Sequence, residues 1–327
     1  MLLTIVIPTF NRRALLAQCL SSLFAQIRSP QDFEIVVVID GASDGTRDYL
    51  RTLNSPCASQ IIEQENRGQA AARNAGIRAA RSPYILLLDD DFICNPDLVQ
   101  QHLEAHDGSA SVIVGPISHD ANPSIPALAV DREIRPYYQR LEAGVYQVPW
   151  LPPNSSLARD LLLNCGGYDE RFSSAREDTD LGIRLAAAGV RFLYEPSAIV
   201  RQNYEKSADQ LVSTSALFGK HDVMLARKFP AYGMQSNLAR LNAGPLWKCT
   251  FRRLVATLPF SAEPFLYPFY VVSASLAGLS PLREAAVRLL NLRRYIVWVR
   301  AAVREAGGWR SLVSLSAQSA ASGKVAE

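Results

Sequence analysis

The sequence predicts an α/β fold with a mostly parallel sheet flanked by helices and a helical C-terminal extension. Within the first ninety or so residues, short β-rich apolar runs alternate with helix-like segments through short connections. This order is typical of right-handed βαβ units. Two of the runs end directly in aspartate, at Asp40 and Asp89. The carboxyl ends of parallel strands can face one crevice, so these two acidic positions could share a ligand.

Apolar runs, turn residues and helix-type spacing define the individual elements. The expected strands are 2–7, 33–39, 60–63, 85–88, 111–115, 154–159 and 190–194, and the expected helices are 12–24, 46–53, 66–80, 97–106, 177–189 and 211–228. Asn11 is expected to cap the first helix, and Asp178 or Thr179 the helix near 177. Residues 119–153 contain several prolines and aromatic residues, which predicts an irregular segment bordering a binding site.

Charge is distributed unevenly along the 327 residues, although the net charge is only +3. Residues 1–200 have 17 basic and 24 acidic side chains, whereas residues 201–327 have 17 and 7. This asymmetry indicates a cation-tolerant site in the first part and a basic contact surface in the second. The five cysteines are scattered without a CxxC pair, which favours a reducing cytoplasmic compartment over a disulfide framework or zinc site. No charged segment precedes an apolar stretch at the N-terminus, so no signal peptide is expected.

Three consecutive carboxylates, Asp89, Asp90 and Asp91, follow the apolar run 85–88. Buried charges without partners are costly, so these residues are expected at the carboxyl end of a strand. Clustered carboxylates repel one another unless a cation joins them, and their oxygens suit Mg²⁺ or Mn²⁺. A solvated acidic turn is the alternative for this segment taken alone.

Five segments together resemble the inverting glycosyltransferases of family 2, which have a GT-A fold. They are Ile5-Val-Ile-Pro-Thr-Phe-Asn11, Val36-Val-Val-Ile-Asp-Gly-Ala-Ser-Asp-Gly-Thr46, Asn66-Arg-Gly with Ala72-Arg-Asn-Ala-Gly76, Leu87-Leu-Asp-Asp-Asp91, and Gly166-Gly-Tyr-Asp-Glu-Arg-Phe172 followed by Glu177-Asp-Thr-Asp-Leu-Gly-Ile-Arg184. They cover roughly residues 3–195 in the order of the family.

The resemblance implies that Asp89 and Asp91 bind the diphosphate through a divalent cation, with Asp91 the more direct metal ligand. Asp90 belongs to the same nucleotide-sugar site but is the least necessary of the three. His221 could complete the shell of the cation, as a histidine does in some GT-A enzymes. A structural or exposed histidine is the alternative.

Asp40 resembles the family's nucleobase-contacting aspartate, although the usual acidic residue before it is Ile39 here. Pro8, Thr9 and Asn11 are expected to border the base, largely through backbone groups. Arg73 could bind phosphate or the aspartates, and a structural salt bridge beneath the site is the alternative.

Asp178 matches the catalytic base of the family, with Glu177 as the alternative. Inverting transfer needs one carboxylate to take a proton from the acceptor hydroxyl. Trp150 and the stretch Pro152-Pro153-Asn154 are candidates for shaping the acceptor pocket, and aromatic core packing is the competing explanation.

The last third of the chain carries no further family motif. The 19 residues from Pro264 to Leu282 lack charge, but three prolines interrupt them, so a membrane span is not expected. Leucines, isoleucine and valines from Leu282 to Val303 form one stripe, with arginines on other faces. This pattern fits a helix on an anionic membrane surface, or a helix packed on the protein with a solvated basic face. The predicted domains are residues 1–230 and a helical, basic extension over 231–327.

The sequence therefore predicts a metal-dependent glycosyltransferase that moves a sugar from a nucleotide donor, UDP-sugar above others, to a glycan or lipid-linked acceptor. Mn²⁺ or Mg²⁺ is the expected cofactor and no nucleic-acid partner is expected. The predicted location is the cytoplasm, with peripheral contact to the membrane as a further option. The alternatives are a non-catalytic nucleotide-sugar-binding scaffold, a metal-dependent nucleotide-sugar hydrolase, and a nucleotidyltransferase. The last lacks its glycine-rich phosphate loop after the first strand.

Overall fold

A computed structural model describes residues 1–119, 123–144, 150–230, 238, 241, 246–257, 263–278 and 280–323. The chain forms two compact units. The first comprises residues 1–122 and 134–204, and the second comprises 123–133 and 205–327. The predicted domain boundary at residue 230 stays a prediction.

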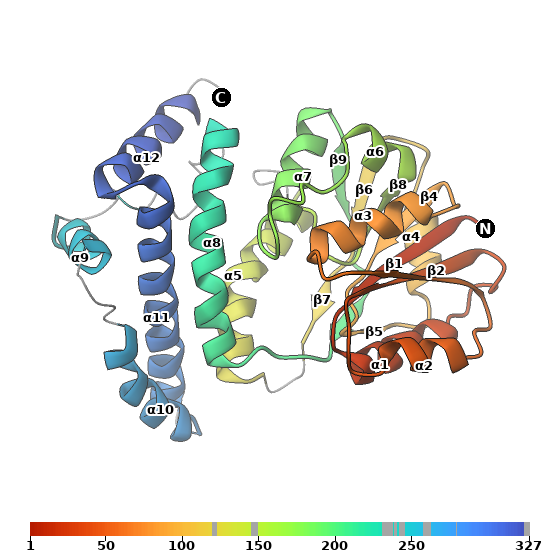
Figure 1. Cartoon of the computed structure of the whole chain (residues 1–327), viewed down its shortest axis with the longest axis horizontal. Helices are drawn as coiled ribbons and strands as arrows, with labels where there is room; N and C mark the ends of the chain where they lie inside the picture. The colour runs from red at the N-terminus through yellow and green to blue at the C-terminus, as the bar shows by residue number, and fades with distance from the viewer. Residues whose placement is uncertain are drawn as a thin grey trace. The chain divides into compact units, whose positions relative to one another are not determined.

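A seven-stranded sheet forms the centre of the first unit (Figure 1). Its strands, in spatial order, are β3 (Ala58–Gln64), β2 (Phe33–Asp40), β1 (Leu3–Thr9), β4 (Tyr84–Leu87), β8 (Ser155–Ala158), β6 (Ser111–Val114) and β9 (Arg191–Tyr194). β8 pairs antiparallel with β4 and β6, whereas the other neighbours in this sheet pair in parallel. The prediction of a mostly parallel α/β sheet is therefore confirmed.

Helices cover both faces of this sheet. The apolar side chains of α1 (Arg13–Phe24), α2 (Thr46–Thr52) and α4 (Leu98–Glu104) pack with Ile5 and Ile7 of β1. On the other face, α3 (Gln69–Ala79), α6 (Arg159–Asn164) and α7 (Glu177–Ala187) share a core with Val6. Figure 1 shows α3 on the opposite side of β1 from α1 and α2. Successive β1 residues thus serve different cores, as the period of a strand requires.

The strand order reverses between β1 and β4, and open α/β sheets form a crevice at such a reversal. From β1 the chain adds β2 and β3 on one side, then returns to place β4 on the other side. Ligands of open α/β sheets bind outside the carboxyl ends of strands at such a reversal. The aspartate triplet, Asp89–Asp91, begins two residues beyond the end of β4 and leads into β5 (Phe92–Cys94). β5 belongs to a second, three-stranded sheet with β10 (Val200–Gln202) and β7 (Ile117–Ser118).

The segment expected to be irregular contains an 18-residue helix, α5 (Ile125–Glu142). The prediction was wrong for these residues because proline was taken as a helix breaker throughout. Pro126 lies in the first turn, where its missing N–H costs little, and Pro136 is accommodated inside the helix. The parts of the predicted segment at 120–122 and 145–149 lie outside the described residues.

Both predicted N-caps in the first unit were wrong. Asn11 has a φ of 52° and Arg12 occupies the cap position of α1. The Asn11 side chain instead accepts a hydrogen bond from the backbone N–H of Ser43 at 2.7 Å. Arg176, with a φ of 67°, precedes α7, so Asp178 and Thr179 lie within the first turn. Asn11 before α1 and Arg176 before α7 both have a left-handed backbone conformation. The periodicity of side chains in the sequence does not reveal this conformation.

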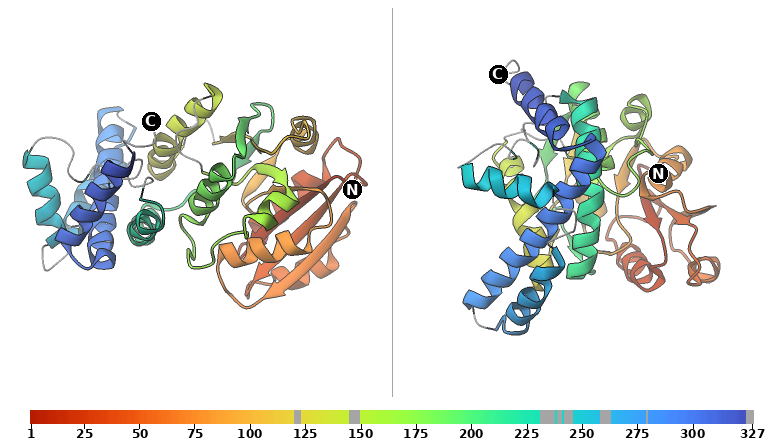
Figure 2. Two further views of the ribbon diagram at one scale, coloured as in Figure 1. Left: turned by 90° about the horizontal axis from the view of Figure 1, so that it is seen from above. Right: turned by 60° about the vertical axis from the view of Figure 1, so that its left-hand side comes forward.

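The second unit is helical. It contains α8 (Ala208–Lys228), α9 (Leu246–Thr257), a short 3₁₀ helix (Glu263–Leu266), α10 (Tyr267–Ser275), α11 (Ser280–Ala306) and α12 (Trp309–Gly323). Figure 2 shows α8 in green beside the long α11 in blue. Ser207 begins α8 with a capping box formed with Gln210.

The apolar stripe of α11 is largely an internal packing surface. Ile296 and Val299 are buried in one core of the second unit, and Leu290 in another. Arg293, 4% exposed, contacts Asp209 and Glu263, and Arg294 contacts Glu133. For α11 the structure therefore favours the packed helix over the helix lying on a membrane. No helix of the described residues has the length and apolarity to cross a bilayer.

Candidate active site

The aspartate triplet meets three different sets of partners. Asp89 accepts hydrogen bonds from Arg73 Nη2 at 2.7 Å and from Gln69 Nε2 at 3.0 Å. Asp90 accepts from Thr9 Oγ1 at 2.8 Å and from Arg12 Nη1 at 3.2 Å. The contact of Thr9, on β1, with Asp90 links the two strand ends at the crevice.

The two carboxylate oxygens of Asp91 have different surroundings. One of its oxygens accepts from Gln202 Nε2 at 3.3 Å and lies 3.5 Å from Arg12 Nη1. The other, Oδ1, is buried and has no hydrogen-bond partner within the described part of the chain. Burial, together with the charge of Asp89, raises the pKa of Asp91 to about 7. A buried carboxylate oxygen without a partner is costly, and a cation would relieve that cost.

The triplet fits a divalent cation held partly by other ligands. Across the described residues, no group of three or more histidine, cysteine, aspartate or glutamate side chains is arranged to hold a metal ion. Mg²⁺ is commonly bound through one or two carboxylates plus substrate phosphates and water. Asp91 Oδ1 and Asp89, with its side chain 22% exposed, match that partial shell.

Arg73 connects the triplet to the start of α7. Its guanidinium contacts Asp89 at 2.7 Å and Glu177 Oε1 at 3.2 Å, and its carbon Cζ lies 5.3 Å from the centre of the Tyr168 ring. The residue is 3% exposed. The contacts with aspartate and the buried salt bridge, two of the alternatives for Arg73, thus occur together.

The acidic pair, Glu177 and Asp178, opens α7. Glu177 is 4% exposed, and its Oε2 finds no hydrogen-bond partner among the described residues. Burial, with Asp178 beside it, raises the pKa of Glu177 to about 7. Asp178 is half-buried, accepts from the backbone N–H of Thr179 at 2.7 Å and also accepts from the indole N–H of Trp150. Asp178 is therefore the more accessible member of the pair.

Asp40 holds the loop between β3 and α3. Its carboxylate accepts from Gln64 Nε2 at 2.7 Å and from the backbone N–H groups of Arg67 and Gly68 at 2.8 and 2.9 Å. Gly68 has a φ of 89°, and a Cβ there would lie 2.7 Å from the carbonyl oxygen of Ser173. Asp40 is thus engaged in the protein itself, and a base contact would use its remaining acceptor capacity.

The other predicted site residues are distributed as follows. Pro8 is buried in β1, and Asn11 is exposed beyond the end of that strand. His221 is 1% exposed and lies on α8 in the second unit. Asp91 and Asp178 lie in the first unit. The metal role of His221 therefore stays a prediction.

Two contributors to the site were missed from the sequence. Arg12 was not considered as a site residue, although a basic residue shortly after the first strand was a usable signal. Asn154 was considered only as part of the acceptor pocket. Its side chain is buried, with Oδ1 3.0 Å from His102 Nε2, and its backbone N–H donates to the carbonyl of Leu87 at 2.7 Å. With a φ of 68°, Asn154 turns the chain from the Trp150 segment into β8.

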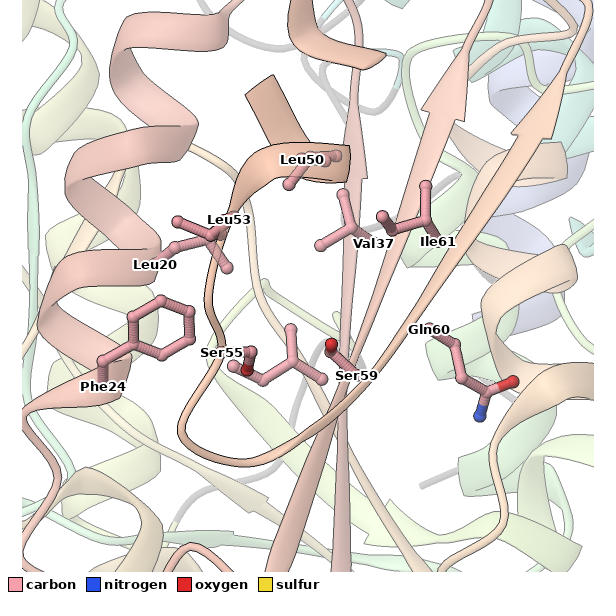
Figure 3. A pocket seen from close by; sticks show the side chains of 10 residues that line it. Leu20, Phe24, Val37, Leu50, Leu53, Ser55, Ser59, Gln60 and Ile61 are labelled. Atoms are coloured by element: carbon pink, nitrogen blue, oxygen red, sulfur yellow. The ribbon is translucent and has the colours of Figure 1, made fainter. Parts of the chain in front are cut away.

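A small pocket lies away from these residues, between α1, α2 and strands β2 and β3 (Figure 3). Leu20, Phe24 and Val37 line it, and it leaves about 20 Å³ for solvent. This volume suits about one water molecule and no nucleotide. The site is therefore assigned from the carboxylates at the strand ends and not from this pocket.

Residues 4–153 match the family model described as glycosyl transferase family 2. A validoxylamine A glucosyltransferase from Streptomyces hygroscopicus subsp. limoneus is 33% identical over 234 residues, covering 62% of this chain and 51% of the relative. Residues 4–153 of the chain belong to glycosyltransferase family 2. The chain spans about half the length of the curated glucosyltransferases it matches. Chondroitin synthase from Escherichia coli is 26% identical, covering 58% of this chain and 33% of that protein.

Solved structures share the fold at low sequence identity. The mannosyltransferase PcManGT from Pyrobaculum calidifontis, in complex with GDP-Man and Mn²⁺, has a TM-score of 0.62 and 19% identity, covering 93% of this chain and 86% of that one. S. aureus TarS 1-349, in complex with UDP-GlcNAc, has a TM-score of 0.54 and 15% identity, covering 94% and 93%. The predicted family and the GT-A fold are confirmed.

Proposed function

We propose that this protein is a metal-dependent inverting glycosyltransferase that uses a nucleotide-sugar donor, with a UDP-sugar as the first candidate. The single observation that carries this proposal is the buried Oδ1 of Asp91, which lies between β4 and β5 and has no hydrogen-bond partner among the described residues. The relatives named as glucosyltransferases support sugar transfer. The structural neighbours contain GDP-Man and UDP-GlcNAc, so both uridine and guanosine donors need testing.

On the donor side, Asp89 and Asp91 would hold Mn²⁺ or Mg²⁺ together with the diphosphate. The cation, when bound, would neutralise the phosphates and act as a Lewis acid toward the leaving group. Pro8, Thr9 and Asn11 would border the nucleobase, and Asp40 would offer it a hydrogen-bond acceptor. Thr9 and Asp90 would keep β1 and the triplet in register through their 2.8 Å hydrogen bond.

On the acceptor side, Asp178 would act as the general base. It would take the proton of the acceptor hydroxyl while that oxygen forms a bond to the anomeric carbon. The bond from this carbon to the diphosphate oxygen would break, and its electron pair would leave with the nucleoside diphosphate. Trp150 would orient one oxygen of Asp178, leaving the carboxylate aligned for the acceptor, a glycan or lipid-linked sugar.

The test is release of nucleoside diphosphate from a panel of UDP- and GDP-sugars, with and without sugar and lipid-linked acceptors. Asp178→Asn is expected to lower turnover by about a hundredfold or more, the usual contribution of a general base, with Mn²⁺-dependent nucleotide binding retained. Glu177→Gln is the comparison. If Asp178→Asn turns over normally and Glu177→Gln does not, Glu177 is the base.

Two other outcomes would favour the alternatives to a transferase. Nucleotide binding without turnover of any donor would support a non-catalytic scaffold. Nucleoside diphosphate release that no acceptor accelerates would support a nucleotide-sugar hydrolase.

For the location, we propose peripheral contact with an anionic lipid surface through the 3₁₀ helix and α10. Phe265, Phe269, Val272 and Leu276 are 67%, 65%, 60% and 51% exposed. Phe269 and Val272 are three residues apart on α10 and share one face of it, while Phe265 precedes this helix and Leu276 follows it. The flanking sequence from Pro264 to Leu282 is uncharged, while residues 201–327 carry an excess of ten basic residues. Exposed apolar side chains on a basic polypeptide suit an anionic bilayer surface.

Sedimentation with vesicles containing phosphatidylserine tests this contact. The double variant Phe265→Ser/Phe269→Ser is expected to remain in the supernatant while the wild type sediments. Leu254→Ser is the control because Leu254 is 55% exposed on another helix, α9. Equal sedimentation of the wild type and the double variant would contradict the contact, and concentration-dependent dimers lost in the double variant would identify a second copy as the occupant.

A further inference from the structure

The side chain of Arg12 contacts two members of the aspartate triplet, Asp90 and Asp91. Arg12 lies three residues beyond the end of β1 and occupies the N-cap position of α1, beside the reversal of strand order between β1 and β4. Its Nη1 is 3.2 Å from Asp90 Oδ1 and 3.5 Å from Asp91 Oδ2. Its guanidinium carbon lies 4.6 Å from the centre of the Tyr204 ring. The side chain is 33% exposed, whereas those of both aspartates are 5% exposed.

Arg73, the other arginine that contacts the triplet, is held more firmly than Arg12. Arg73 is shared between Asp89 and Glu177 and is almost fully buried. Arg12 makes no ion pair in the described residues other than those with Asp90 and Asp91. The negative charges of Asp90 and Asp91 are therefore balanced by the guanidinium of Arg12, which is partly accessible to solvent.

A divalent cation at the triplet would change the partner that Arg12 prefers. Two positive groups at the same carboxylates repel each other, so the guanidinium would lose much of its attraction to Asp91. A diphosphate arriving with the cation supplies new anionic oxygens at the same crevice. Guanidinium groups bind phosphate through paired N–H donors, which makes this an effective exchange.

We propose that the Arg12 guanidinium changes its ion-pair partner when the donor binds. It pairs with Asp90 and Asp91 in the metal-free protein, and it pairs with the diphosphate of the donor when metal and nucleotide are bound. This proposal rests on the proposed function, because it assumes a metal–diphosphate site at the triplet. It assigns Arg12 two roles with opposite effects. Arg12 opposes binding of the bare cation and favours binding of the cation with nucleotide.

The experiment measures Mn²⁺ binding by calorimetry, first alone and then with UDP or GDP. Arg12→Gln is expected to tighten binding of Mn²⁺ alone by about threefold to tenfold, the scale of a partly exposed ion pair. The same variant is expected to weaken nucleoside diphosphate binding at saturating Mn²⁺ by about tenfold or more, the scale of a lost charge-assisted hydrogen bond. Arg12→Lys, which keeps the charge without the paired donors, is expected to lie between Arg12→Gln and the wild type in both measurements.

Arg13→Gln is the matched control. Arg13 is the next residue, its side chain is exposed, and its guanidinium lies over the Tyr49 ring at 6.0 Å. It should bind Mn²⁺ and nucleotide like the wild type. Unchanged Mn²⁺ affinity in Arg12→Gln, or changes of both affinities in the same direction, would overturn the exchange. A wild-type protein that binds neither Mn²⁺ nor nucleotide would instead contradict the proposed function itself.

Discussion

Two acidic clusters, the aspartate triplet after β4 and the acidic pair at the start of α7, differ in the cations that face them. Each cluster contains one carboxyl group whose pKa burial raises to about 7, Asp91 in the triplet and Glu177 in the pair. Glu177 faces the buried Arg73, whereas Asp91 faces the partly exposed Arg12.

The difference separates a fixed counterion from a replaceable one. Arg73 is enclosed by Asp89, Glu177 and the Tyr168 ring, so its removal would leave buried charges without a partner. Arg12 reaches solvent, where another cation can take its place. The acidic pair is thus suited to keep its arginine counterion, and the triplet is suited to exchange its arginine for a metal. The following predictions test this contrast.

The largest effect is expected for Arg73→Met. Removing the guanidinium leaves Asp89 and the buried Glu177 without their shared cation, so the free energy of unfolding should fall by about 3–5 kcal/mol, typical of a broken buried ion pair. Urea denaturation at neutral pH measures this loss.

Arg67→Ala is the control for a surface ion pair. Arg67 contacts Glu170 at 2.7 Å but its side chain is 59% exposed, so a loss of about 1 kcal/mol or less is expected. Equal losses in the two variants would show that Arg73 is not the fixed counterion described above.

Asp91→Asn is expected to stabilise the metal-free protein at alkaline pH. The folded pKa of Asp91 is about 7, above the value near 4 of an unfolded aspartate. Its contribution to stability is therefore fully present below pH about 4 and is lost as the pH rises through about 7. Asparagine avoids this loss, so the variant should gain on the order of 1–3 kcal/mol over the wild type at pH 8.

Denaturation at pH 5 and pH 8 separates this effect from that of Glu177, which both proteins retain. The difference in stability between variant and wild type should grow from pH 5 to pH 8. Added Mn²⁺ should stabilise the wild type more than the variant at pH 8. Parallel pH profiles for the two proteins would contradict the assignment of a strained carboxylate to Asp91.

Trp150→Phe gives the smallest expected effect. It keeps an aromatic ring against Tyr137, whose ring centre lies 4.9 Å away, but removes the N–H that Asp178 accepts. Losing this one hydrogen bond should lower turnover by about fivefold to tenfold while the KM for the donor stays constant. Tyr138→Phe is the control, because its hydroxyl lacks a hydrogen-bond partner in the described structure. A rise in the donor KM with constant turnover would place Trp150 on the donor side.

Local sequence patterns predicted the features that depend on local chemistry. The apolar runs before Asp40 and Asp89 became β2 and β4, and the segment expected to re-enter the sheet at 154–159 became β8. The position of the triplet at a strand end followed from the cost of burying carboxylates in a strand.

Features that depend on distant contacts could not be read in the same way. Arg12 meets Asp90 across 78 positions, and Arg73 meets Glu177 across 104. The helix α5 was missed because proline tolerance depends on the position within a helix and on its packing. Asn11 was misassigned as a cap because its backbone is left-handed and its side chain accepts a hydrogen bond from Ser43, 32 positions away.

The antiparallel strand β8 separates two groups of site residues along the chain. Thr9, Arg12, Asp40, Arg73 and the triplet all precede residue 92, whereas Trp150 and Asp178 follow the excursion that ends at β8. The register of β8 is fixed by pairing with β4 and by the buried Asn154, so the chain before it can vary without shifting the donor-side strands. The stretch up to Trp150 can therefore be substituted without altering the strands that carry the residues proposed for the donor side.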